Sequence, residues 1–181
     1  PLMIPTVSLD LTLQGAREFM RLRSEAGLPP TDTKLALWIY CAESESEARA
    51  GAERYMREYA DSALRHYEMT GTHFDGITGY EGYAQRAAAL RSDPTPFLDG
   101  FFARHPWGTP EMVVEKISEL AEQFGTSEIM GVFRYGGMSH AEAARSMTLF
   151  AENALPEVQR LNPEPMSLSS AVPAGTDATR T

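Results

Sequence analysis

The segment Trp107-Gly108-Thr109-Pro110-Glu111-Met112-Val113-Val114-Glu115-Lys116-Ile117, with the sequence that follows it, decides the fold. Thr109 is a suitable N-cap residue and Pro110 suits the first position of a helix, so a helix is expected to begin here. Gly125 is expected to end that helix. Apolar residues recur between these ends at the spacing of one helical face, which predicts a buried stripe. They are Val113, Ile117, Leu120, Ala121 and Phe124.

A strand and a second helix follow. Residues 128–134 predict a strand, and Ser139-His140-Ala141-Glu142 is a capping box that opens the last helix. The apolar side chains of that helix are expected to face inward; they are Ala143, Met147, Phe150, Ala151 and Ala154. The order helix, strand, helix is typical of the last unit of a parallel β/α protein.

Two strand–helix pairs precede this unit. Residues 35–41 are almost all apolar, which predicts a strand that is covered on both faces. Residues 2–7 are a short apolar run that fits either a buried strand or the edge of a loop, and Pro5 should end or bend a strand here. A helix is expected over residues 11–26, and the capping box Ser44-Glu45-Ser46-Glu47 predicts a long helix that runs toward Tyr67.

The rest of the chain is less regular. Residues 70–107 are rich in Gly and Pro, and only residues 81–91 among them have a helical pattern. Such a long excursion inside a compact domain is typical of a lid or a binding loop. Residues 162–181 are dominated by Pro, Ser, Ala, Gly and Thr, which predicts a disordered tail. The predicted domain therefore spans residues 1–161, with residues 70–107 as an insertion.

Composition excludes several classes of protein. The net charge of −9 argues against nucleic acid or an anionic membrane as the main partner. The sequence has no run of ~18 apolar residues and no secretory signal. Its single cysteine, Cys41, rules out an intrachain disulfide and fits a reducing compartment. An acidic, soluble, cytoplasmic protein is expected.

The strand count suggests a piece of a larger fold. Strands that alternate with helices imply a parallel sheet with right-handed crossovers. A closed eight-stranded barrel needs ~250 residues, whereas this chain has 181 residues and three convincing strands. The chain also begins on strand-like sequence, with no leader. We therefore expect that further strands complete the fold.

Taken in order, these segments resemble the C-terminal end of the bacterial luciferase-like flavin monooxygenases. The resemblance covers about residues 1–161. It rests on Gly108-Thr109-Pro110-Glu111 with its helix, on the strand at 128–134, and on Leu149-Phe150-Ala151 with Leu155-Pro156. Residues 1–7 are similar to the sixth barrel strand of that family and residues 35–43 to the seventh. Residues 75–83 are similar to the start of the family's mobile insertion.

The resemblance implies an α/β fold that is the C-terminal portion of a TIM (β/α)8 barrel of the luciferase-like type. It also implies a flavin cofactor, reduced FMN or in one branch the deazaflavin F420, and O2 that oxygenates a small organic substrate. The family's usual catalytic residues and much of its phosphate grip lie in strands outside this chain. The expected partner is therefore the N-terminal half of the barrel or a homologous subunit in a dimer, and the catalytic residues are unknown.

Two alternatives stay open. One is a non-catalytic, truncated homologue that binds flavin or a partner protein. The other is an F420-dependent oxidoreductase of the same superfamily.

Barrel geometry nominates the site residues, because functional side chains lie at the C-terminal ends of the strands. The expected cofactor-binding residues are Thr6, Val7, Ser8, Tyr40 and Arg134. Cys41 and Tyr135 occupy neighbouring positions. Val7 stands where some family members place an aromatic residue beside the flavin. The Arg134 guanidinium is suited to binding a flavin phosphate or carbonyl oxygen. A salt bridge at a loop is an equally compatible interpretation.

Other reactive residues carry weaker signals. The four histidines are scattered without the spacing of metal ligands, so no metal site is expected. Cys41 has no histidine near it in the sequence and reads as a small buried hydrophobic residue. Gly136-Gly137 follows the strand at 128–134 and could approach a phosphate, but a lone glycine pair is a weak signal.

Overall fold

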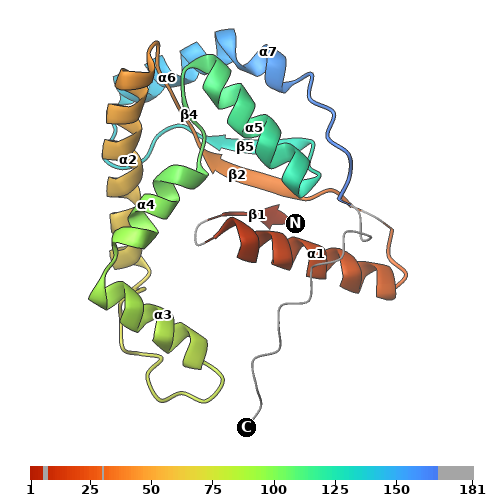
Figure 1. Cartoon of the computed structure of the whole chain (residues 1–181), viewed down its shortest axis with the longest axis vertical. Coiled ribbons are helices and arrows are strands. Elements are labelled where there is room, and N and C mark those ends of the chain that lie inside the picture. Colours follow the sequence, from red (N-terminus) through yellow and green to blue (C-terminus); the bar gives the residue numbers. More distant parts are fainter. Residues whose placement is uncertain (6–7, 30, 167–181) are drawn as a thin grey trace.

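The computed structural model describes residues 1–5, 8–29 and 31–166. This part of the chain has a mixed α/β fold of seven helices and five short strands (Figure 1). In chain order they are β1 (Leu2–Met3), α1 (Leu9–Glu25), β2 (Lys34–Trp38), β3 (Tyr40–Cys41), α2 (Glu45–His66), α3 (Glu81–Ser92), α4 (Thr95–Arg104), β4 (Trp107–Gly108), α5 (Pro110–Phe124), β5 (Glu128–Val132), α6 (His140–Asn153) and α7 (Leu155–Val158).

The strands form two small parallel sheets, which confirms the expected parallel arrangement. The larger sheet has the order β1-β2-β5, and its register pairs Met3 with Leu35 and Trp38 with Val132. The smaller sheet pairs β3 with β4. Strands β2 and β3 are separated only by Ile39, whose amide donates to the carbonyl oxygen of Val132.

The chain changes partner at this point. The amide of Tyr40 donates to the carbonyl oxygen of Pro106, at a distance of 3.1 Å. The sequence predicts one continuous strand over residues 35–41, and the structure divides it between two neighbours. Because both pairings are parallel, the carboxyl ends of β2, β3 and β5 still point the same way.

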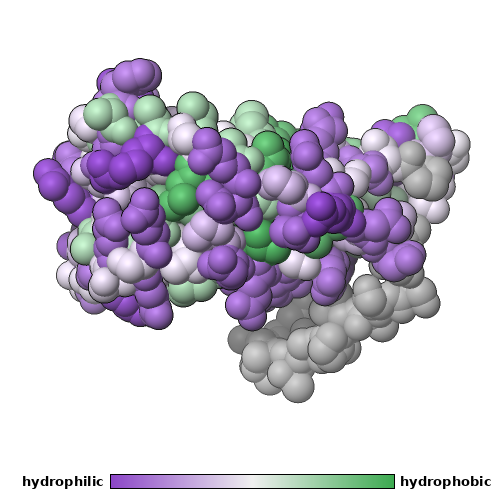
Figure 2. Space-filling view, turned by 90° about the horizontal axis from the view of Figure 1, so that it is seen from above, coloured by the Kyte–Doolittle hydropathy of each residue, from purple (hydrophilic) through white to green (hydrophobic). Residues whose placement is uncertain are grey.

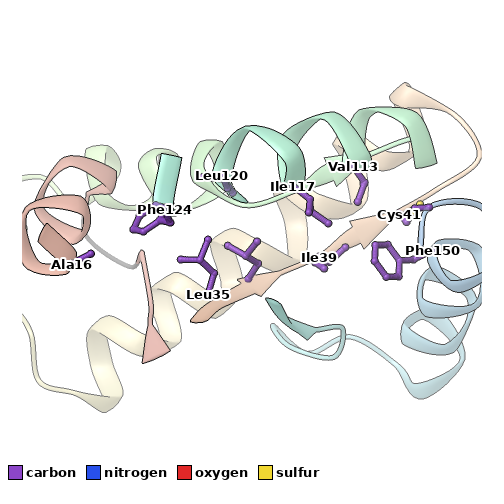
Figure 3. Close-up of a cluster of buried hydrophobic side chains, with 11 residues drawn as sticks. Ala16, Leu35, Ile39, Cys41, Val113, Ile117, Leu120, Phe124 and Phe150 are labelled. Atoms are coloured by element: carbon purple, nitrogen blue, oxygen red, sulfur yellow. The ribbon is translucent and has the colours of Figure 1, made fainter. Parts of the chain in front are cut away.

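One face of β2 packs against α5, which lies across the sheet in Figure 1. Leu35, Leu37 and Ile39 alternate onto this face, as a strand requires. Figure 3 shows Val113, Ile117, Leu120 and Phe124 of α5 above these side chains. Every residue of the predicted α5 stripe is buried. This stripe therefore supplies one side of the main hydrophobic core.

The opposite face of the strand packs against α2 and α4. Trp38 and Tyr40 point this way, and the Trp38 ring lies 5.4 Å from Phe101 of α4 and 4.9 Å from Tyr59 of α2. Buried small residues let α2 approach closely; they are Ala48, Ala52 and Ala60. Both faces of the strand are thus covered, as its apolar sequence predicts.

Several cap predictions are confirmed. The hydroxyls of Ser44 and Ser139 accept hydrogen bonds from the amides of Glu47 and Glu142 at the starts of α2 and α6. Gly125 ends α5 in a left-handed conformation. Thr109 is the N-cap residue of α5, but its side chain makes no capping hydrogen bond and donates to Glu111 instead.

Two elements inside the excursion differ from prediction. Residues 95–104 form α4, although Gly100 and the flanking prolines read as helix breakers. Pro96 lies in the first turn, where a missing amide costs nothing, and Phe101 buries the helix against its neighbours. Trp107 and Gly108 form strand β4 rather than leading directly into a helix.

Three other expectations need correction. Strand β1 ends at Met3, before Pro5. Strand β5 ends at Val132, so Arg134 lies beyond it. On α6, Met147 is 49% exposed and Ala151 is also exposed, while Ser146 is buried. The buried face of α6 runs through residues 143, 146, 150 and 154 because Ser146 hydrogen-bonds the strand.

The end of the described chain lies against the core. Met166 packs against the hydrophobic cluster beneath α5, and residues 162–166 have no regular secondary structure. The predicted disordered tail otherwise falls on residues 167–181, outside the described residues. The face shown in Figure 2 is mostly hydrophilic, with small hydrophobic patches between hydrophilic residues. Among the described helices, none is long and apolar enough to cross a membrane.

Candidate functional site

A cavity of about 290 Å³ lies at the carboxyl end of β3. Strand β3 supplies Tyr40 and Cys41, the segment after it supplies Glu43, and the N-terminal turns of α2 and α6 supply the rest of the polar lining. The residues of these turns are Glu47, Glu142, Arg145 and Ser146. In parallel β/α folds this edge is where binding sites form, because loops and helix N-termini gather there.

Tyr40, Glu142 and Arg145 form a hydrogen-bonded chain in this cavity. The Tyr40 hydroxyl donates to Oε1 of Glu142 at 2.6 Å, and Nη2 of Arg145 donates to the same oxygen at 2.8 Å. Burial, together with the hydrogen bond to Glu142, raises the pKa of Tyr40 well above its usual value. The phenol therefore stays protonated and acts as a hydrogen-bond donor.

Cys41 and Ser146 tie the strand to α6. The amide of Cys41 donates to the Ser146 hydroxyl at 2.9 Å, and both residues are buried. Burial, followed by the charge of Glu111, raises the pKa of the Cys41 thiol to about 11. A thiol with this pKa is not a nucleophile at neutral pH. Cys41 is thus the buried residue that its sequence context predicts.

The cavity is acidic. Three carboxylates line it, those of Glu43, Glu47 and Glu142, against the single guanidinium of Arg145. Two donors already occupy Oε1 of Glu142. An excess of carboxylates repels a phosphate group and favours a neutral or cationic one. This cavity therefore does not fit the phosphate of a flavin nucleotide.

The expected cofactor-binding residues are dispersed. Thr6 and Val7 lie outside the described residues. Ser8 caps α1, where its hydroxyl accepts a hydrogen bond from the amide of Leu11. Tyr40 is buried, and its ring lies 5.9 Å from the ring of Tyr55 on α2. Arg134 is exposed beyond the end of β5.

Tyr40 and Arg134 are nonetheless related by the sheet. Each lies two residues after the paired residues Trp38 and Val132, so both follow the carboxyl ends of neighbouring strands. Tyr135, next to Arg134, is buried and donates its hydroxyl to the carbonyl oxygen of Ile39 at 3.1 Å. This bond fixes the loop that carries Arg134 against the strand.

The glycine pair after β5 packs against α2. Gly136 and Gly137 have φ values of 55° and 70°. A Cβ atom on Gly136 would overlap with the backbone carbonyl of Tyr55, and one on Gly137 would meet the carboxylate of Glu58. The glycines therefore serve a close helix contact, and the backbone at Gly136 is not open toward a phosphate.

A buried histidine was not singled out by its sequence. His105 is 1% exposed and packs against Phe101 and Trp38, with ring centroids 4.3 and 5.1 Å away. Its Nδ1 accepts from the amide of Trp38 at 3.4 Å, so the neutral ring carries its proton on Nε2. Within the described residues, neither His105 Nε2 nor Trp38 Nε1 has a hydrogen-bond partner.

The burial of His105 predicts a loss of stability in acid. Burial, and then the charge of Arg104, lowers the pKa of His105 to about 3. The unfolded chain takes up this proton near the usual pKa of ~6.5, so stability falls as the pH decreases from that value toward 3. Between pH 7 and 4.5, we expect wild type to lose about 2–3 kcal/mol more than a His105→Gln variant. Urea unfolding across this range measures the difference, and parallel curves for the two proteins would contradict it.

The hydrogen-bonded chain of Tyr40, Glu142 and Arg145 was also not predicted from the sequence. Glu142 occupies the N3 position of a capping box, a role that its backbone amide does fill. Its side chain nevertheless turns to Tyr40. Ser146 follows Glu142 by four residues, which places both on one side of α6. This spacing is the feature of the sequence from which a polar face of the helix could have been predicted. In the described part of the chain, no His, Cys, Asp or Glu group is arranged to hold a metal ion.

No family model and no curated protein sequence matches this chain. Its structure is similar to that of monooxygenase RslO1 from Streptomyces bottropensis, with a TM-score of 0.52 and 24% identity. That match covers 86% of this chain and 40% of RslO1.

A second similar structure is a type II Baeyer–Villiger monooxygenase, the oxygenating constituent of 3,6-diketocamphane monooxygenase from the CAM plasmid of Pseudomonas putida, in complex with FMN. The TM-score is 0.54 at 21% identity, over 91% of this chain and 43% of that chain. This chain thus spans less than half the length of either protein. Its mixed α/β fold is similar to a portion of the fold of these two monooxygenases.

Proposed function

We propose that this chain is the C-terminal part of a luciferase-like (β/α)8 barrel in a flavin-dependent monooxygenase. The enzyme would use reduced FMN and O2 to oxygenate a small organic substrate. The observation that carries the proposal is the match of 91% of the chain to a monooxygenase whose structure holds FMN. The alternation of parallel strands with helices supports it.

In this proposal, part of the active-site wall comes from this chain and the other functional residues come from the rest of a barrel. When bound, reduced flavin supplies the electrons that activate O2 for transfer of an oxygen atom to the substrate. In this chain, Tyr40 would form part of the wall at the strand ends, and its protonated hydroxyl holds Glu142 in place. The two buried faces of β2 exclude water from beneath that wall.

Arg134 is the residue of this chain best suited to the flavin. It is an exposed cation at a strand end, whereas the cavity beside Tyr40 is acidic. A guanidinium binds phosphate or carbonyl oxygens through several N–H donors. The main phosphate grip would come from outside this chain, either from the N-terminal half of the barrel or from a homologous subunit.

Replacing Arg134 should weaken flavin binding. In the complete protein, Arg134→Ala is expected to lower FMN affinity about tenfold, the usual effect of losing a hydrogen bond to a charged group. Quenching of flavin fluorescence in a titration measures the affinity. Arg65→Ala is the matched control, because Arg65 is an exposed residue of α2 that pairs with Asp61. Equal affinities in all three proteins would show that Arg134 is not part of the site.

One observation favours a second candidate, a non-catalytic module that binds a partner through its sheet edge. Among the described strands, β5 pairs only with β2, and Met130 on it is 49% exposed. An open strand edge is a template for pairing with another chain. The two candidates separate on activity: oxygenation of a small organic substrate by reduced FMN and O2 in the completed protein, above the level seen with free reduced FMN, supports the enzyme, and its absence supports the module. A parallel binding titration with F420 in place of FMN tests the deazaflavin alternative.

A further inference from the structure

A second, larger cavity lies in the excursion, away from the strands. Its volume is about 690 Å³, and it is enclosed by the C-terminal end of α2, by α3 and by the start of α4. Figure 1 shows α3 and its preceding loop at the end of the molecule remote from the sheet. The cavity shares no residue with the one beside Tyr40. Its size falls in the range of small-molecule sites, roughly 300–1,000 Å³.

Its walls are mainly apolar and aromatic. Phe74, Tyr83 and Phe97 contribute rings, and Met69, Leu90 and Pro96 contribute aliphatic surface. The Phe74 and Tyr83 rings lie 5.3 Å apart at an angle of 42°, and Phe74 also stacks on Tyr80 at 5.2 Å. Aromatic walls of this kind favour a ligand that itself carries an aromatic ring.

The wall is held in position before any ligand arrives. Arg91 of α3 donates to the carbonyl oxygens of Thr70 and Gly71, at 3.1 and 2.8 Å, and approaches Asp75 at 3.7 Å. These bonds fix the loop that carries Phe74 to helix α3. A preformed wall reduces the entropy that a ligand must overcome on binding.

The cavity also has one cation available for a ligand. The guanidinium of Arg86 lies over the Tyr83 ring, with 5.4 Å between its carbon and the ring centroid. Among the described residues, no carboxylate lies within ion-pair distance of Arg86. Glu68, the acidic residue of the lining, is turned toward His73 at 3.9 Å. The described lining thus has one cation, Arg86, and one carboxylate, Glu68, which lies toward His73, so Arg86 is the group of the lining that can meet an anion.

We propose that this cavity binds an aromatic anion, such as an aryl carboxylate or aryl sulfonate. The ring would lie among Phe74, Tyr83 and Phe97, and the anionic group would meet Arg86. The proposal requires no flavin, so its test is independent of the proposed monooxygenase function.

Calorimetric titration with naphthalene-2-sulfonate tests this proposal on the purified chain. We expect saturable binding of one molecule, and binding at least about fivefold weaker for the cation 2-naphthylmethylamine, which has the same ring system. Leu90→Trp, which places a larger ring in the cavity, should weaken binding. Arg86→Gln should weaken binding of the sulfonate about fivefold and remove the preference over the amine.

Arg65→Gln is the control, since Arg65 also lies on an exposed helix surface but does not line the cavity. It should bind the sulfonate as wild type does. Circular dichroism verifies that each variant is folded. If Leu90→Trp does not fold, Arg86→Gln still tests the proposal. The proposal is overturned if wild type shows no saturable binding, if it binds amine and sulfonate equally, or if a folded Arg86→Gln binds as wild type does.

Discussion

Gly136→Ala should destabilise the fold more than any other single methyl addition to the loop after β5. Gly136 has a φ of 55°, and a Cβ atom there would overlap with the carbonyl oxygen of Tyr55 on α2. A backbone contact cannot relax by rotating a side chain, so the loop or the helix must move. We expect a loss of about 3–5 kcal/mol in the free energy of unfolding, measured by urea denaturation followed by circular dichroism.

Gly76→Ala is the matched control for this prediction. Gly76 also has a positive φ, 76°, but nothing lies within 4 Å of its added Cβ. It therefore carries the conformational strain without the overlap, and should cost about 1 kcal/mol. Equal losses in the two variants would mean that the loop does not pack against α2 as described.

Phe124→Ala should produce the second large loss. Phe124 ends the buried stripe of α5, is 0% exposed, and packs in the cluster shown in Figure 3. Removing its ring leaves a cavity between α5 and β2, because the helix and the sheet can collapse only in part. The expected cost is about 3–5 kcal/mol, measured by the same urea unfolding.

Met147→Ala provides the comparison on a neighbouring helix. Met147 was expected to face inward, yet it is 49% exposed. Its truncation should change stability by less than about 0.5 kcal/mol. A loss comparable to that of Phe124→Ala would restore the inward assignment and contradict the packing of α6.

The regular elements were predictable because local signals agreed. The apolar stripe of α5 lies between a Pro at the start of the helix and a Gly after its end. The apolar run at residues 35–41 had one interpretation, a strand buried on both faces. The elements that were not predicted, α4 and β4, form because of tertiary contacts. Helix α4 forms because Phe101 is buried against Trp38 and Tyr59. Strand β4 exists because Tyr40 and Cys41 pair with Trp107 and Gly108. No local pattern contains that information.

The candidate site was less predictable than the fold. Strand-end geometry nominated Tyr40 and Cys41 from the sequence, and in the structure both line a cavity. It could not show that Glu142 and Arg145, about a hundred residues later, complete the lining. It also could not show that the cavity is acidic. Long-range charge pairing depends on how α6 is rotated, and the buried hydrogen bond of Ser146 to the Cys41 amide joins residues far apart in the sequence.

Flavin binding by this chain, alone and with the rest of a barrel, tests the central claim most directly. The 181-residue chain and the chain combined with the N-terminal half of a luciferase-like barrel would each be titrated with FMN, with binding followed by flavin fluorescence. The proposal predicts one FMN bound per complete barrel, no flavin binding by the isolated chain, and, in the complete protein only, oxygenation of an organic substrate by reduced FMN and O2. Stoichiometric FMN on the isolated chain would contradict the shared site, and no flavin binding by either sample would contradict the proposed function.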